Sequence, residues 1–224
     1  MTPRFRRIAT FLLIGATAYA GLSLLYVPCA SAYVSVFCTC CDIVFGRPAP
    51  SCTAEFDPLP PGERSAGADL RIEVKNYATG GMQKLHTSAR YRGFVPTAIT
   101  ASLVLATPLA VRRRVRALFW GMTLVHLYIL FTVWLSLFSA LTNDTVVAAF
   151  KLPAPVKLAL ELTKGVLAVA PGGSVIAPIP IWIAATFRRG DLAMLLADGP
   201  PPAPAAQTTL PQSVSKPQRR RSRT

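Results

Sequence analysis

The sequence predicts an all-α polytopic membrane protein with four transmembrane helices and a small outer segment that contains the cysteines. Of its 224 residues, 52% are hydrophobic and only 15% are charged, and the mean hydropathy of +0.42 is high for a soluble domain. Four apolar stretches are long enough to cross about 30 Å of hydrocarbon as helices. Basic residues lie at the ends of these stretches.

The first apolar stretch, residues 8–27, follows the short N-terminus 1–7 and contains no charge. A cleaved signal peptide is the alternative, because three arginines precede the stretch and residues 30–32 have the small side chains of a cleavage site. The apolar part of a signal peptide has only about 7 to 15 residues. We therefore expect an uncleaved signal anchor.

Residues 28–92 are predicted to form the outer segment, which is too short for a large core. Several prolines make residues 46–65 irregular. Polar and apolar residues alternate over 70–75, which predicts one half-buried strand, and Thr79-Gly80-Gly81 ends it.

All five cysteines fall in this outer segment, on the oxidising side of the membrane, where disulfides form. They are Cys29, Cys38, Cys40, Cys41 and Cys52. The alternative is a metal or redox cluster, but the spacing lacks the second Cys-x-x-Cys or His half of a zinc site. We expect disulfides or inert thiols, with at least one thiol left over, and no metal or cofactor.

Three further membrane spans and their connections follow. The predicted segments are a span at 93–111, a basic cytoplasmic loop at 112–116, a span at 117–141, an outer loop at 142–165, a span at 166–187 and a cytoplasmic tail at 188–224. An interfacial helix is expected over 153–164, from the spacing of its apolar and charged residues. The tail is rich in Pro, Ala, Gln, Ser and Thr, which predicts disorder from about residue 199.

Basic residues predict the orientation, because segments rich in them stay on the cytoplasmic side. With both termini inside, the inner segments hold 14 basic and two acidic residues, against 10 basic and eight acidic residues outside. The net charge of +14 therefore needs no nucleic acid partner. Arg90 and Arg92 run against this trend, and we expect them to snorkel to the interface. The residues that set the topology are Arg112, Arg113, Arg114, Arg116, Arg188 and Arg189.

His126 is the one ionisable residue well inside a predicted span, which makes it a candidate functional residue. The structural alternative is a hydrogen bond to a nearby threonine or carbonyl. Thr132, Ser136 and Ser139 share a stripe of the same predicted helix. Small polar residues let membrane helices pack closely, so we expect a packing face there, with the threonines and alanines of the second span opposite it.

The fourth predicted span is interrupted by Pro171-Gly172-Gly173 and Pro178, which a regular helix does not accommodate. Broken helices line binding sites in transporters. With no carboxylate inside any span, we favour a kink that docks on a partner.

Several short motifs resemble those of the small membrane proteins that accompany exosortases, over most of residues 8–190. They are Asn76-Tyr77, Arg92-Gly93-Phe94-Val95-Pro96 and Pro178-Ile179-Pro180-Ile181-Trp182, the last before two arginines. The resemblance implies a protein of the bacterial inner membrane whose partner is an exosortase-like enzyme. It also implies a role in sorting proteins at the envelope. Exosortases carry a cysteine inside the membrane, which the last three predicted spans of this chain lack.

No nucleophile with a positioned base, no glycine-rich phosphate loop and no catalytic carboxylate pair is recognisable. We therefore expect a non-enzymatic accessory or scaffold protein that binds the lipid bilayer and another integral membrane protein, in protein sorting or exopolysaccharide-linked export. One alternative is a small transporter or channel subunit that uses the broken fourth span and His126. Another is a thiol-redox enzyme with a reactive pair among Cys38, Cys40 and Cys41.

Overall fold

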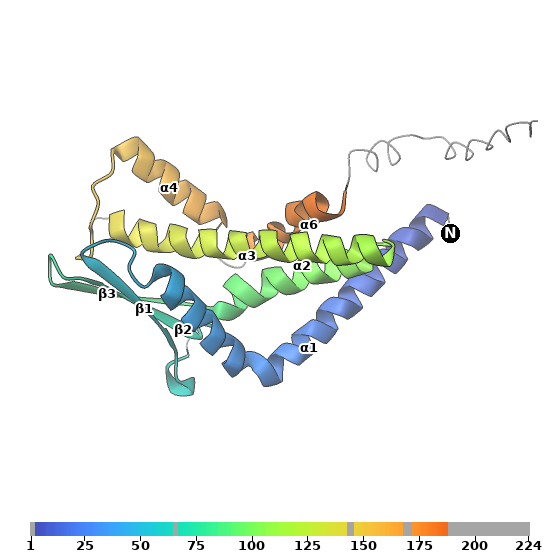
Figure 1. Cartoon of the computed structure of the whole chain (residues 1–224), viewed down its shortest axis with the longest axis horizontal. Coiled ribbons are helices and arrows are strands. Elements are labelled where there is room, and N and C mark those ends of the chain that lie inside the picture. Colours follow the sequence, from blue (N-terminus) through green and yellow to red (C-terminus); the bar gives the residue numbers. More distant parts are fainter. Residues whose placement is uncertain (1–2, 65–66, 143–145, 168–171, 188–224) are drawn as a thin grey trace, which may run out of the picture. The chain divides into compact units, whose positions relative to one another are not determined.

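The computed structural model describes residues 3–64, 67–142, 146–167 and 172–187, which are mostly helical with one small sheet (Figure 1). The longer helices are α1 (Pro3–Phe45), α2 (Val95–Ala106), α3 (Val111–Thr142) and α4 (Ala154–Leu167). The shorter ones are the 3-10 helix η1 (Pro61–Glu63), the π-helix η2 (Arg90–Phe94), α5 (Gly172–Ile176) and α6 (Pro178–Thr186). The strands are β1 (Cys52–Pro58), β2 (Leu70–Asn76) and β3 (Gly81–Thr87). The helical character is confirmed, and the expectation of an all-α chain is wrong.

Two helices within the described residues are long and apolar enough to cross a membrane, Ile8–Phe45 of α1 and Val111–Thr142. A third crossing results if α4 and the α5–α6 pair, bent by 62°, form one broken span. The four spans of the prediction are therefore not confirmed. The break at 168–171 and the tail from Arg188, including Arg189, lie outside the described residues.

The predicted second span, 93–111, corresponds to a shorter helix. α2 has 12 residues and rises about 18 Å, which is less than the hydrocarbon thickness. It ends because Pro108 disfavours helical backbone at the residue before it, and Thr107 is extended with φ −71° and ψ 129°. The turn therefore comes before the basic run 112–116, which the prediction placed in a loop. These arginines occupy the first turns of α3 instead.

Helix α1 extends well past residue 27, where the prediction ended its membrane part. It continues through Pro28 to Phe45, and its second half packs against the sheet. Val34, Phe37 and Cys41 belong to the same buried cluster as the strand residues. Apolar burial therefore keeps residues 28–45 helical, where the prediction had the start of an outer segment.

The sheet is antiparallel with the order β1-β2-β3. The strand predicted over 70–75 is confirmed as β2, and its residues alternate between buried and half-buried. β1 lies within the stretch predicted to be irregular, and it pairs with β2 along its whole length. Its first strand residues, Cys52, Ala54 and Phe56, alternate onto the buried face. The carboxylate of Asp42 on α1 accepts the backbone N–H of Phe56 at 2.9 Å, which fixes the edge strand to the helix.

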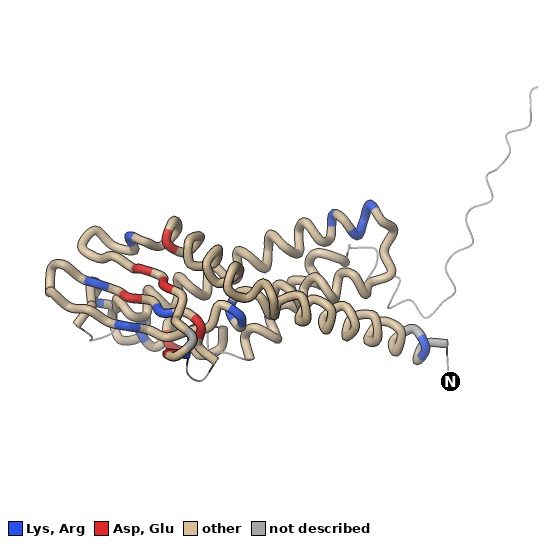
Figure 2. The backbone as a smooth tube through the Cα atoms, turned by 90° about the horizontal axis from the view of Figure 1, so that it is seen from below, with Lys and Arg blue, Asp and Glu red and all other residues tan. Residues whose placement is uncertain are grey.

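Charged residues gather at two ends of the helices, and a nearly charge-free stretch separates them (Figure 2). One end holds the start of α1 and the first turns of α3, and the sequence has no Asp or Glu in residues 1–41 or 77–142. The other end holds the sheet and α4, where both signs occur. Such a distribution is typical of membrane helices, whose charge-free middle lies in hydrocarbon.

Candidate functional site

The predicted polar stripe of α3 lies buried beside charged side chains. Thr132, Ser136 and Ser139 are all buried. Charged residues from η2 and α4 face this stripe, where the prediction expected small residues of the second span. α2 packs on α3 elsewhere, since a Cβ on Gly121 would lie 3.2 Å from Cγ2 of Thr100.

Arg92 is the charged group on one side of the stripe. Its Nη1 donates to Ser136 Oγ at 2.7 Å and to the Thr132 carbonyl at 3.4 Å. Desolvation lowers the pKa of the guanidinium, although an arginine stays protonated at any physiological pH. The prediction had Arg92 snorkel to the interface, and in the structure its side chain reaches across to α3. Its neighbour Arg90 stacks instead over the ring of Tyr26, with its Cζ 5.6 Å from the ring centroid.

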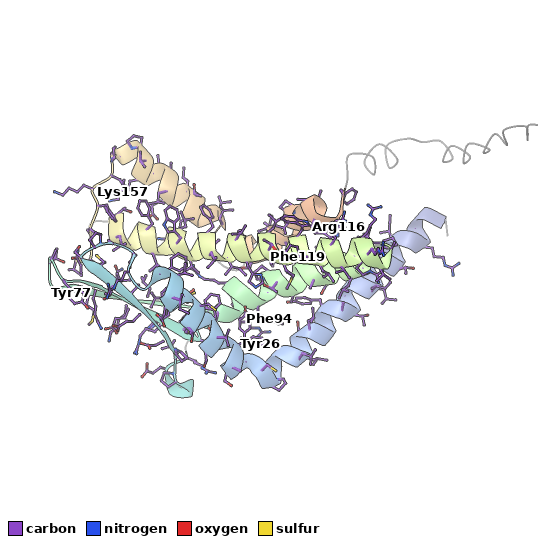
Figure 3. The ribbon with its side chains drawn as sticks, viewed as in Figure 1. Tyr26, Tyr77, Phe94, Arg116, Phe119 and Lys157 are labelled. Atoms are coloured by element: carbon purple, nitrogen blue, oxygen red, sulfur yellow. The ribbon has the colours of Figure 1, made fainter. Side chains whose placement is uncertain are left out.

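Two local features hold Arg92 in place. Asp69 accepts the backbone N–H of Ala89 at 2.6 Å and of Arg90 at 3.4 Å, so its carboxylate caps the start of the helix that carries Arg92. Aromatic rings of α1 pack on the other side, where Tyr26 lies beside Phe94 with centroids 4.4 Å apart (Figure 3).

On the other side of the stripe, α4 contributes Glu161 and Lys164. Ser139 Oγ donates to Glu161 Oε1 at 2.6 Å, and Lys164 Nζ donates to Ser139 Oγ at 2.8 Å. Lys164 also pairs with Glu161 at 3.5 Å. The helix predicted over 153–164 is thus present as α4, and it is tied to α3 by this network.

A cavity of about 160 Å³ opens where these groups meet the sheet. Arg92, Lys164 and Ser136 line it together with Gln83, His86 and apolar side chains of β2, β3 and α3. The lining contains two cations and no carboxylate. Gln83 Oε1 is buried there and has no hydrogen-bond partner among the described residues.

His126 lies away from this cavity, on the exposed face of α3. Its Nδ1 is 2.6 Å from the carbonyl oxygen of Met122, one turn earlier. A carbonyl only accepts, so this contact puts the proton on Nδ1 and leaves Nε2 of the neutral ring as an acceptor. A shallow apolar groove surrounds the ring, lined among others by Phe119 and Leu127.

The cysteines lie on two elements, four on α1 and Cys52 on β1. Cys38, Cys41 and Cys52 are buried in the packed cluster between helix and sheet, whereas Cys29 and Cys40 are exposed. All five carry free thiols in the structure. No group of three or more His, Cys, Asp or Glu side chains within the described ranges is arranged to hold a metal ion.

The topology-setting arginines fall into two groups. Arg112, Arg113, Arg114 and Arg116 lie in the first turns of α3, and Figure 3 marks Arg116 at that end of the helix. Arg188 and Arg189 lie outside the described residues.

Arg92, Lys164 and Gln83 were not predicted to belong to any site. The partners of Arg92 are 40 and 44 residues away in the chain, and no local spacing reports such a contact. The one available signal was an arginine directly before an apolar run, in a chain with a serine stripe on another apolar helix.

Neither a protein-family model, nor a curated protein, nor a solved structure matches this chain.

Proposed function

We propose that this protein is a non-enzymatic accessory or scaffold protein of an integral membrane complex, and that the His126 face of α3 docks on the partner. The bacterial inner membrane, with both termini in the cytoplasm, is the location that the charge distribution favours. The exosortase-like motifs of the sequence favour a membrane enzyme of protein sorting as the partner.

The exposure of His126 carries this proposal. α3 begins its apolar part at Ala117, after the basic run, and about 20 residues from there cross the hydrocarbon. His126 therefore lies near the middle of the bilayer. Ionisable residues at this depth almost always face the interior of a helix bundle. An exposed histidine at mid-membrane is the expected sign of a bundle whose remaining helices come from another chain.

The geometry also suggests what the partner supplies. With its Nδ1 proton directed to the Met122 carbonyl, the neutral ring presents Nε2 outward as an acceptor. A hydroxyl or other donor on a partner helix would complete the pair, in a medium that offers no water. The flanking apolar groove with Phe119 and Leu127 would supply the packing around it.

Photo-crosslinking in membranes tests the proposal directly. A photoreactive amino acid replaces Leu127 on the His126 face, and in a matched variant it replaces Leu24, which is equally apolar and exposed on α1. We expect a crosslink from position 127 to a different integral membrane protein, much weaker from position 24. His126→Ala should reduce copurification of that protein after mild detergent extraction, while His86→Ala, at the other histidine, should leave it unchanged.

Three outcomes would count against the proposal. They are a chain that stays monomeric and partnerless, equal crosslinking from both positions, and full copurification with His126→Ala. A crosslinked species of twice the chain mass would make the partner a second copy.

A further inference from the structure

We propose that the cavity between η2, α3, α4 and the sheet binds a phosphate group, with Arg92 and Lys164 as its two cationic contacts. This inference is independent of the partner that docks on the His126 face.

The hydrogen bonding of Arg92 is incomplete. A guanidinium has five N–H donors, and the bonds described for Arg92 run from Nη1 alone, to Ser136 and to the Thr132 carbonyl. Within the described chain it forms no ion pair with a carboxylate. A charge in such a position is costly unless a counter-charge joins it, and phosphate offers several acceptor oxygens to a forked donor.

The other side chains that line the cavity also suit a phosphate group. Lys164 also lines the cavity, and two of the three donors of its Nζ are directed to Ser139 and Glu161, which leaves one for a ligand. Gln83 lines the cavity as well; its amide oxygen is buried without a hydrogen-bond partner in the described part of the chain, and its NH₂ group carries two further donors. A volume of about 160 Å³ is several times the roughly 30 Å³ share of one water molecule.

The depth of the cavity indicates where the phosphate comes from. Counted from Ala117, about 20 residues of α3 cross the hydrocarbon and end at Ser136, the partner of Arg92. The cavity therefore lies at the level of the lipid headgroups. Beside it, α4 exposes several apolar side chains that would be stable only against lipid or a partner. A phospholipid headgroup is the nearest source of phosphate, and a soluble phosphate is the other.

Binding is measured on the purified full-length protein in a non-ionic detergent. One arm titrates inorganic phosphate by calorimetry. The other adds phosphatidylglycerol or phosphatidylcholine and counts retained lipid by native mass spectrometry. We expect one bound phosphate or one retained phosphatidylglycerol per chain, and at least tenfold weaker binding for Arg92→Gln. Arg90→Gln is the matched control, since its side chain stacks outside on Tyr26, and it should bind like the wild type.

Arg92→Gln can also weaken folding, so a second variant is needed. Gln83→Glu places a carboxylate in the cavity wall, and we expect it to abolish binding without lowering the thermal unfolding midpoint. Binding of phosphatidylglycerol alone identifies the lipid headgroup as the source, and binding of inorganic phosphate identifies a soluble ligand. The proposal is overturned if the wild type binds neither probe, or if Arg92→Gln or Gln83→Glu binds as tightly as the wild type.

Discussion

Gly93 lies where Tyr33 and Phe37 of α1 contact the π-helix η2. A Cβ at this position would be 3.0 Å from Phe37 Cε2 and closer still to the Tyr33 hydroxyl. Glycine is therefore required here by the close approach of the helices, and its backbone has no unusual conformation. The position of Arg92 depends on this contact, because the two residues are adjacent.

We predict that Gly93→Ala destabilises the protein by about 1–3 kcal/mol, because α1 or η2 must shift to accommodate the methyl group. The measurement is the denaturant midpoint of the detergent-solubilised protein. Gly21→Ala in α1 is the control, since a Cβ there meets nothing within 4 Å, and alanine is the better helix former. Tyr33→Phe should recover part of the loss in the double variant. Equal effects of the two glycine substitutions would contradict this explanation.

The thiols give a second prediction at the residue scale. Only Cys29 and Cys40 are exposed, so N-ethylmaleimide should modify two cysteines in the native protein and all five in denaturant without reductant. Intact mass spectrometry counts the added groups. Three or fewer modifications in denaturant would indicate a disulfide, one of the two states, disulfides or inert thiols, that were predicted for these cysteines.

At the scale of elements, α3 and α4 are connected through Ser139, which is fully buried. Its hydroxyl donates to Glu161 and accepts from Lys164, so one side chain joins two charged groups of α4 to α3. Removing this hydroxyl leaves two partly buried charges with fewer partners, and such groups are costly to leave unpaired.

We predict that Ser139→Ala loosens α4 by about 1–3 kcal/mol, seen as faster amide hydrogen exchange over residues 154–167. Ser102→Ala is the matched control, because that buried hydroxyl donates only to the Ala98 carbonyl of its own helix. In the Ser102→Ala variant, amide hydrogen exchange over α4 should match that of the wild type. Unchanged exchange in Ser139→Ala would mean that apolar packing alone holds α4 in place.

Elements with a long regular pattern were predictable from the sequence, and those defined by their neighbours were not. The long apolar stretch of α3 and the alternating pattern of β2 were enough to identify these two elements in the sequence. β3, with Met82 and Lys84 pointing outward, has too few apolar residues to be recognised before β2 is known to pair with it. The continuation of α1 to Phe45 depends on burial against the sheet, which residues 28–45 alone do not report. The cavity could not be predicted because its lining comes from five elements that are far apart in the sequence.

At the scale of the whole molecule, the membrane topology tests the predicted orientation of the helices. The start of α1 and the first turns of α3 lie at one end of the described helices, and this end is basic without acidic residues (Figure 2). The sheet lies at the other end, so the positive-inside rule assigns it to the outer side.

We predict that a reporter enzyme that works only in the periplasm, such as alkaline phosphatase, is active when it is inserted at the β2–β3 turn near Gly80. A reporter that works only in the cytoplasm should be active when it is fused after Arg114. The comparison uses matched fusions of both reporters at each site. A cytoplasmic signal at Gly80 would overturn the orientation, and cytoplasmic signals at both sites would also overturn the membrane depth assigned to Ser136.

The π-helical turn at Arg90–Phe94 makes the molecule sensitive to the number of residues in this segment. A π-turn holds one residue more than an α-helical turn of the same rise, so a chain lacking one residue there could form a continuous regular helix into α2. Such a deletion would rotate the preceding residues by about 100° relative to α2. The guanidinium of Arg92 would then turn away from Ser136. The extra residue of the π-turn thus determines the rotation of Arg92 about the helix axis. Deletion of one residue would change this rotation and leave the apolar helices at their full length.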